Sequence, residues 1–190
     1  MSDPKRKTVN KFCTKTTICI TTLNRPEFLE RTFTYYRDTG FGGVILIGDG
    51  SLGDMAEANK SLAERFNDDF RIDYFGAPEL TQPATMKAMS EQVDTDYAVY
   101  SGDDDFFIPA TMEICEQILD EHPEFIAFHG TAFALNADGV RGMPVSVDAY
   151  LLPIMMSEGS FPRIEEFFIG YGVSIFNLHR ADAWREMHRR

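Results

Sequence analysis

Basic residues, cysteines and long apolar runs are scarce in this 190-residue chain. It has 18 lysine and arginine residues against 30 aspartate and glutamate residues, which gives a net charge of −12. Such a surface repels nucleic acid and anionic membranes and excludes them as general partners. The three cysteines, Cys13, Cys19 and Cys115, lack metal-ligand spacing, and this sparse usage is typical of a reducing compartment. We therefore expect a cytoplasmic protein that does not bind nucleic acid.

Membrane-spanning and export signals are also missing from the sequence. No apolar run approaches the roughly 18 residues that cross a bilayer, and no signal-peptide core follows the first residues. We therefore expect no integral membrane segment. Residues 1–15 are polar and basic, which predicts a flexible tail. Peripheral contact between this tail and a membrane stays open.

The remainder, residues 16–190, has enough apolar material for a single globular domain. Hydrophobic residues make up 44% of the chain, with 16 phenylalanines and 7 tyrosines. Apolar and β-branched segments predict strands at residues 17–23, 44–47, 71–75, 97–101 and 125–135. Segments with apolar residues at helical spacing lie between them. This alternation predicts an α/β domain with a mostly parallel central sheet flanked by helices.

The pattern is weaker beyond residue 136. It predicts a short helix at residues 163–168, a final strand at residues 172–177 and a final helix at residues 181–188. We therefore divide the predicted domain into an N-terminal half, residues 16–136, and a C-terminal half, residues 137–190.

Three consecutive carboxylates follow the predicted strand at residues 97–101. Asp103, Asp104 and Asp105 have no basic neighbour in the sequence, and side by side they repel one another. A hard divalent cation such as Mg²⁺ or Mn²⁺ prefers oxygen ligands and relieves this repulsion. The stretch therefore predicts a metal site. The alternative is a solvated acidic turn that caps the helix beginning near Pro109.

Two other predicted strands also end in polar turns. Residues 24–26, Asn-Arg-Pro, follow the first strand, and residues 48–51, Gly-Asp-Gly-Ser, follow the second. Ligands of open α/β sheets bind at the carboxyl ends of the strands, which share one edge of the sheet. We therefore expect Thr21, Asp49 and Asp103 to line one cleft.

These segments, taken together and in this order, resemble a known family. Residues 20–26 (I-T-T-L-N-R-P) resemble the opening I-P-T-Y-N-R-P of family 2 nucleotide-sugar glycosyltransferases, which have a GT-A fold. Residues 47–51 (I-G-D-G-S) resemble the V-D-D-G-S block of that family. Residues 103–109 resemble its D-x-D block, and their D-D-D-F-F sequence is similar to that of a bacterial subgroup. The resemblance covers residues 17–136 and is weak beyond them.

The resemblance implies roles for these residues. Thr21 and Asp49 would contact the nucleoside of a nucleotide-diphosphate sugar. Asp103, Asp104 and Asp105 would hold Mn²⁺ or Mg²⁺ together with the ribose and the diphosphate, whose charge the metal offsets as the sugar bond breaks. The other implied substrate-binding residues are Thr22, Asn24, Arg25, Ser51 and Lys87. The alternative for the last of these is a solvated lysine on a helix.

The chain departs from the family pattern at several positions. Gly48 replaces the first acid of V-D-D-G-S, and Thr21 replaces the proline of the opening block. Met86 and Met89 stand where an R-N-x-G segment of the family has its arginine and glycine. These departures leave the identity of the donor open.

An acidic general base is also implied, because inverting members use one to deprotonate the acceptor hydroxyl. In the family it lies some way beyond a segment resembling residues 173–184, and no E-D pair follows that segment here. We expect the base either outside this chain or at Glu165 or Glu166. The alternative for this acidic pair is a solvated helix start.

The sequence supports one function and one alternative. The first is a metal-dependent, inverting glycosyltransferase that moves a sugar from a nucleotide-diphosphate donor to a glycan or another acceptor. The alternative is a non-catalytic module that binds a nucleotide sugar or a glycan. A nucleotidyltransferase lacks support because no glycine-rich phosphate loop lies near the N-terminus. A haloacid-dehalogenase phosphatase lacks support because residues 18–23 contain no acid.

Overall fold

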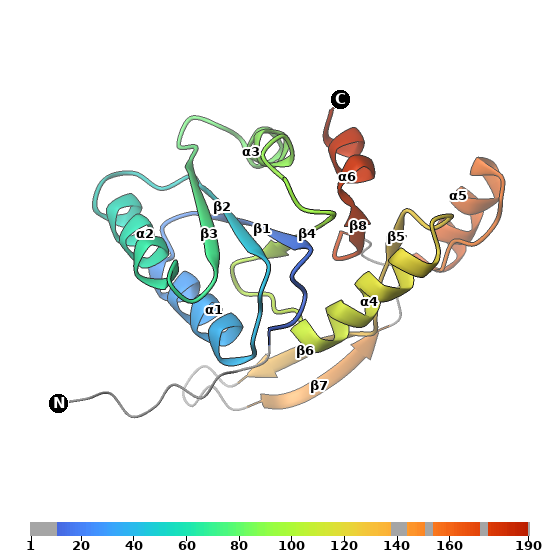
Figure 1. Cartoon of the computed structure of the whole chain (residues 1–190), viewed down its shortest axis with the longest axis horizontal. Coiled ribbons are helices and arrows are strands. Elements are labelled where there is room, and N and C mark those ends of the chain that lie inside the picture. Colours follow the sequence, from blue (N-terminus) through green and yellow to red (C-terminus); the bar gives the residue numbers. More distant parts are fainter. Residues whose placement is uncertain (1–10, 138–143, 151–153, 172–174, 190) are drawn as a thin grey trace. The chain divides into compact units, whose positions relative to one another are not determined.

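The computed structural model describes residues 11–137, 144–150, 154–171 and 175–189 (Figure 1). The chain divides into two compact units. The first comprises Met1–Phe128 with Leu178–Arg190, and the second comprises His129–Asn177. The first ten residues of the predicted basic tail lie outside the described residues. Closer to the first strand, Phe12 forms a bridge with Phe41, and Cys13 is buried.

A six-stranded sheet forms the centre of the first unit, in the order β3-β2-β1-β4-β8-β5. Its strands are β1 (Thr16–Thr22), β2 (Val44–Asp49), β3 (Arg71–Gly76), β4 (Tyr97–Gly102), β5 (Ala127–Phe128) and β8 (Leu178–Arg180). The first four are parallel, while β8 runs antiparallel to both β4 and β5. The predicted α/β fold with a mostly parallel sheet is confirmed.

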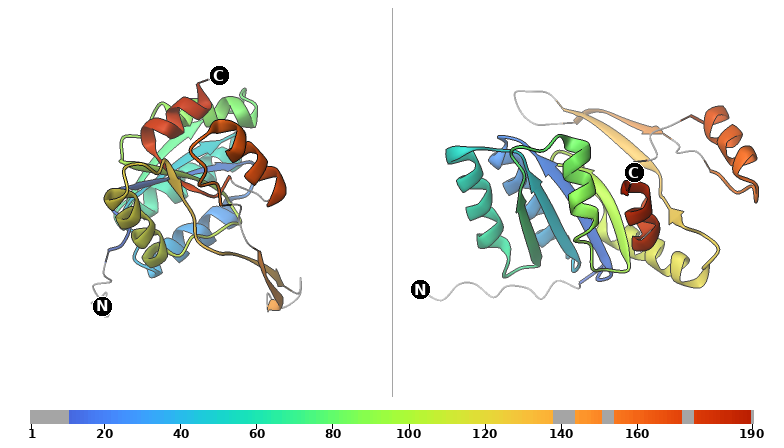
Figure 2. Two further views of the ribbon diagram at one scale, coloured as in Figure 1. Left: turned by 90° about the vertical axis from the view of Figure 1, so that its right-hand side faces the viewer. Right: turned by 90° about the horizontal axis from the view of Figure 1, so that it is seen from above.

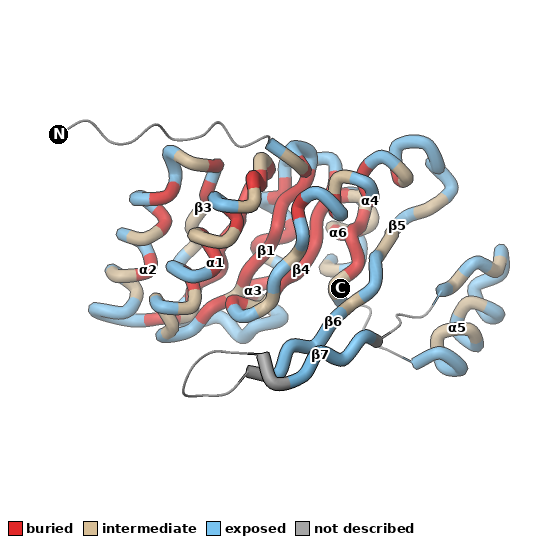
Figure 3. Tube along the Cα trace, turned by 90° about the horizontal axis from the view of Figure 1, so that it is seen from below, coloured by how far each residue is buried: buried red, intermediate tan, exposed pale blue. Residues whose placement is uncertain are grey.

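Helices cover both faces of this sheet. On one face lie α1 (Pro26–Asp38), α2 (Gly53–Phe66) and α4 (Pro109–Glu121), and on the other lie α3 (Gln82–Ser90) and α6 (Ala181–His188) (Figures 1 and 2). The central strands are therefore covered on both sides, and every residue of β2 is buried (Figure 3). This explains why β2 is a continuous apolar run followed by Gly-Asp.

The turn after α1 shows how the sequence returns the chain to the sheet. The helix ends at Asp38, and Gly40 has a left-handed φ of 78°, a conformation that favours glycine. The Phe41 N–H then donates to the Tyr36 carbonyl at 2.9 Å. Phe41 is fully buried, so the chain enters β2 with this side chain already in the core.

The C-terminal part differs from the prediction in two places. The predicted strand at residues 125–135 is wrong as a single strand, because the chain breaks at His129-Gly130 into β5 and β6 (Ala132–Ala137), which belong to different sheets. The predicted final strand at residues 172–177 lies partly outside the described residues. Ile175–Asn177 is not a strand, and β8 begins at Leu178.

Among its described residues, the second unit has a two-stranded sheet and one helix. Strand β6 pairs antiparallel with β7 (Pro144–Tyr150), which the sequence did not predict. Helix α5 (Ser160–Ile169) contains the predicted short helix, and α6 of the first unit has the predicted bounds. Within the described ranges, no helix combines the length and apolar character needed to cross a membrane.

Glu116 is a buried carboxyl group of α4 that faces the start of β1. Its Oε1 accepts hydrogen bonds from Thr16 Oγ1 at 2.6 Å and from the Lys15 N–H at 3.3 Å. Burial nevertheless raises the pKa of Glu116 above its ordinary value of about 4.5. The folded state therefore binds this proton more tightly than the unfolded state does. This tighter binding stabilises the fold below pH 4.5, and the stabilisation is lost as pH rises through the folded pKa of Glu116.

Replacing Glu116 by glutamine should therefore increase the free energy of unfolding at pH 7 and remove part of its fall between pH 4.5 and 7. The amide oxygen keeps both hydrogen bonds, and the buried charge is lost. Urea unfolding of both proteins across this range measures the effect, with exposed Glu121→Gln on the same helix as the control. Lower stability of Glu116→Gln at pH 7 would show that the charged carboxylate is the favoured state.

Candidate functional site

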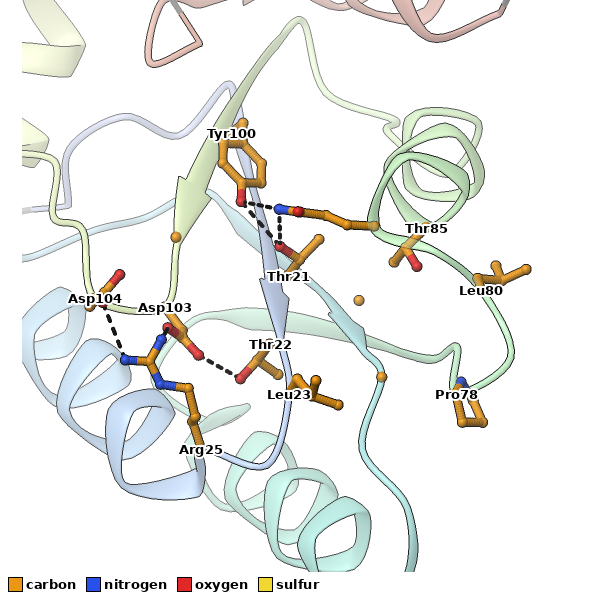
Figure 4. A pocket seen from close by; sticks show the side chains of 14 residues that line it. Thr21, Thr22, Leu23, Arg25, Pro78, Leu80, Thr85, Tyr100, Asp103 and Asp104 are labelled. Carbon is orange, nitrogen blue, oxygen red and sulfur yellow. Dashed lines mark hydrogen bonds and ion pairs between the residues drawn. The ribbon is translucent and has the colours of Figure 1, made fainter. Parts of the chain in front are cut away.

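A pocket of about 470 Å³ opens at the carboxyl edge of the parallel strands in the first unit (Figure 4). It is lined by Thr21, Thr22, Leu23, Arg25, Gly48, Gly50, Pro78, Leu80, Gln82, Thr85, Tyr100, Gly102, Asp103 and Asp104. These residues come from the ends of β1, β2 and β4, the loops that follow β1 to β4, and α3. The sheet edge thus gathers residues far apart in the sequence, as expected for an open α/β sheet.

Asp103 is the buried carboxylate of the pocket. Its Oδ2 accepts a hydrogen bond from Thr22 Oγ1 at 2.8 Å, and its Oδ1 accepts one from Arg25 Nη1 at 2.7 Å. Its main-chain carbonyl accepts from Thr32 Oγ1 on α1 at 2.9 Å. Burial raises the pKa of Asp103, while Thr22 and the charge of Arg25 oppose the rise.

Arg25 lies between two of the three acids. Its Nη2 donates to Asp104 Oδ2 at 3.2 Å (Figure 4). Its guanidinium also stacks over the Phe28 ring at 3.7 Å. The turn before α1 sets this position, because Asn24 has a left-handed φ of 56° and Pro26 begins the helix. The Asn24 N–H is held by Ser51 Oγ at 2.7 Å, which ties this turn to the one after β2.

The three carboxylates of the acidic motif do not all have the same partner. Asp103 and Asp104 face Arg25, and the Asp105 carboxylate accepts instead from the Gly102 N–H at 3.3 Å. In the part of the chain that the structure describes, no three His, Cys, Asp or Glu side chains are grouped so that they could hold a metal ion. Carboxylate oxygens suit Mg²⁺ and Mn²⁺ chemically, and the metal-binding role of the three acids stays a prediction.

Asp49 lies at the same sheet edge as Asp103 but in a buried network. It is 1% exposed and does not line the pocket. Its Oδ1 accepts from the Ser51 N–H at 2.8 Å, and its Oδ2 accepts from Asn59 Nδ2 at 2.8 Å and Tyr74 Oη at 2.6 Å. The structure therefore brings Thr21 and Asp103 into one pocket, whereas the contact between Asp49 and a nucleoside stays a prediction.

A polar wall of the pocket was missed from the sequence. Gln82 Nε2 donates to Tyr100 Oη at 2.9 Å and to Thr21 Oγ1 at 3.4 Å, and the two hydroxyl groups lie 3.2 Å apart. Tyr100 is a hydroxyl-bearing residue two positions before Gly102 in a buried strand, which is the available sequence signal. Gln82 has no local signal, because it is an ordinary polar residue at the start of α3.

Gly48, which replaces an acid of the family pattern, faces α3. A Cβ at this position would lie 2.5 Å from Met89 Sδ and 2.5 Å from Thr85 Cγ2. An acidic side chain therefore does not fit against α3 as it packs here. Met89, which stands where the family's R-N-x-G segment has its glycine, lies against Gly48, so these two departures from the family pattern meet in the structure.

The remaining predicted site residues lie elsewhere. Lys87 is exposed on α3 and donates to the Arg189 carbonyl at 3.1 Å, and it does not line the pocket. Glu165 and Glu166 belong to α5 of the second unit. Ser157 donates to Glu166 from its Oγ at 2.6 Å, and hydrogen bonds from Ser157 lower the pKa of Glu166. The roles predicted for these three residues stay predictions.

No protein-family model matches the chain, and no curated protein matches it. Among solved structures, the crystal structure of S. aureus TarS 1–349 superposes with a TM-score of 0.61 at 13% identity, over 92% of this chain and 49% of that one. TarS 1–349 in complex with UDP-GlcNAc gives 0.61 at 12% identity, over 92% and 47%. The chain thus spans about half the length of these structures. It shares their fold, a GT-A-like α/β fold with a mostly parallel central sheet.

Proposed function

We propose that the pocket binds a nucleotide-diphosphate sugar and that the chain belongs to a glycosyltransferase acting on a glycan or another acceptor. The observation that carries this proposal is the buried Asp103 at the carboxyl edge of the sheet, beside Thr22 and Arg25. A carboxylate and a guanidinium at one end of an open polar pocket suit a ligand with both hydroxyl groups and phosphates. The fold shared with TarS, which was crystallised with UDP-GlcNAc, supports it.

The two ends of the pocket differ in chemistry, and this suggests how the donor lies. Thr21, Gln82 and Tyr100 form a neutral hydrogen-bonding wall that suits a base or ribose. Arg25 and the acidic motif form the charged end, where we place the diphosphate. Mn²⁺ or Mg²⁺, predicted from the sequence, would supply positive charge to the leaving diphosphate. In the arrangement described here Arg25 faces Asp103 and Asp104, so a metal ion bound there would displace Arg25 or share the carboxylates with it.

The non-catalytic binding module remains the second candidate. The observation that favours it is the state of Glu166, which is held by Ser157 and has a lowered pKa. Ser157 already holds the Glu166 carboxylate, whereas Glu165 is exposed. We therefore assign the base role to Glu165 if the base lies in this chain.

A turnover assay with a panel of UDP- and GDP-linked sugars and Mn²⁺ tests both candidates. For a glycosyltransferase with its base in this chain, Glu165→Gln should lower the transfer rate about 10²-fold, the lower end of the usual range for general base catalysis. Glu166→Gln should cost less, and exposed Glu158→Gln in the same unit should have no effect.

Calorimetry with the same panel separates the remaining outcomes. Binding of a nucleotide sugar without transfer by any variant would favour the non-catalytic module. Transfer that is insensitive to both glutamine variants would place the base outside these two residues. Failure of every nucleotide sugar to bind would contradict the proposed function itself.

A further inference from the structure

Arg25 lies between two carboxylates of the acidic motif. Its Nη1 contacts Asp103 Oδ1 at 2.7 Å and its Nη2 contacts Asp104 Oδ2 at 3.2 Å, so one guanidinium spans two carboxylates. The pairing joins residues from the turns after β1 and β4, which the sheet places side by side. The close-up shows the guanidinium between the two acids (Figure 4).

Asp103 needs such a partner. Its side chain is only 4% exposed, and a buried carboxylate is costly unless it is paired and hydrogen-bonded. Thr22 supplies a neutral hydrogen bond, and Arg25 supplies the positive charge. Any cation that binds at Asp103 must therefore displace Arg25 or share the carboxylate with it.

Arg25 is placed so that it can be displaced. Its side chain is 38% exposed, Asp104 is half exposed, and the third contact of the guanidinium is the face of Phe28. The pair with Asp104 is exposed on both sides and is therefore weak, because water screens it. One positive charge also leaves the three carboxylates of the motif only partly neutralised, and a diphosphate would add further negative charge.

We propose that Arg25 and a divalent cation compete for Asp103 and Asp104, so that the protein takes up the cation together with a nucleoside diphosphate and not alone. Without nucleotide, the guanidinium holds the two carboxylates. With nucleotide, the diphosphate supplies oxygen ligands to the dication and an alternative partner to Arg25. The nucleotide-dependent part of this proposal rests on the proposed function, whereas the competition itself does not.

Titration with Mn²⁺, followed by the electron paramagnetic resonance signal of the free ion, tests the competition without any turnover. In the absence of nucleotide, Arg25→Gln should bind Mn²⁺ at least about 10-fold more tightly than the unchanged protein. Arg31→Gln is the matched control, because Arg31 also lies over the Phe28 ring, at 4.7 Å. It should behave as the unchanged protein does. Arg25→Lys keeps one positive charge but lacks the two guanidinium nitrogens that bridge the carboxylates. Its Mn²⁺ affinity should lie between those of the unchanged protein and Arg25→Gln.

Repeating the titration with UDP as the probe tests the second part. UDP should increase Mn²⁺ affinity of the unchanged protein several-fold more than that of Arg25→Gln. Equal Mn²⁺ affinities of the unchanged protein and Arg25→Gln, or no Mn²⁺ binding by either, would overturn the competition. If UDP binds to neither protein, the nucleotide-dependent part of the proposal fails, and a uridine nucleotide is not the donor. The comparison without nucleotide still decides whether Arg25 and the cation compete. Should Arg25→Gln fail to fold, Arg25→Lys against the unchanged protein decides it.

Discussion

Replacing Asp103 by asparagine should lower sugar transfer about 10³-fold and weaken binding of the nucleotide-diphosphate sugar. The substitution removes the buried carboxylate that orients Arg25 and that would hold the cation proposed to offset the charge of the diphosphate. Removing a single preorganised electrostatic group from a reacting site typically costs 10²–10³-fold in rate. The amide retains the size of the carboxylate, so the fold should persist.

Calorimetry and turnover with the same donor measure the effect of Asp103→Asn. The control is Asp94→Asn, because Asp94 also pairs with an arginine, Arg71 at 2.8 Å, but both side chains are exposed. This surface pair should contribute little to either property. Unchanged donor affinity and rate in a folded Asp103→Asn protein would mean that the donor does not bind at this end of the pocket.

Asp49→Ala should destabilise the first unit by about 3–5 kcal/mol, the usual cost of leaving a buried polar network without its central acceptor. Three donors would lose Asp49 as their acceptor: the Ser51 N–H, the Asn59 amide and the Tyr74 hydroxyl. Only longer contacts, at 3.2 Å to Ser51 Oγ and 3.3 Å to the Ala56 carbonyl, would remain for the amide and the hydroxyl. The three donors come from the turn after β2, from α2 and from β3, so the loss affects three elements together.

Urea unfolding measures this loss, with Asp54→Ala in the first turn of α2 as an exposed control. The same experiment separates the two roles considered for Asp49. A stable Asp49→Ala protein that no longer binds nucleotide would show that the side chain contacts the nucleoside, as the family resemblance implies. An unstable protein whose folded fraction still binds nucleotide would show that Asp49 holds the turn instead.

The sheet and its functional edge were predictable because their signals are local. The apolar runs that became β1, β2 and β4 are bounded by polar turns within a few residues, and parallel strands bring those turns together. This was enough to place Thr21 and Asp103 in one pocket. It was not enough to orient Asp49, whose partners Asn59 and Tyr74 lie on other elements.

The pairing between Arg25 and Asp103 also could not be predicted from the sequence, because it too joins different elements. The two residues are 78 positions apart, and nothing local distinguishes an arginine that meets a carboxylate from one that meets a phosphate. The hairpin of β6 and β7 was not predicted for a different reason. Phe133 and Leu135 are apolar but exposed, so they extended the predicted strand at residues 125–135 across the break between β5 and β6.

The position of β8 gives the second unit the character of an insertion. The chain leaves the sheet after Phe128 and re-enters it at Leu178, and these two residues are direct partners in the antiparallel pair of β5 and β8. The entry and exit points therefore lie next to each other, as in a hairpin. Evolution can lengthen, shorten or exchange everything between them without shifting the register of a single strand beneath the pocket.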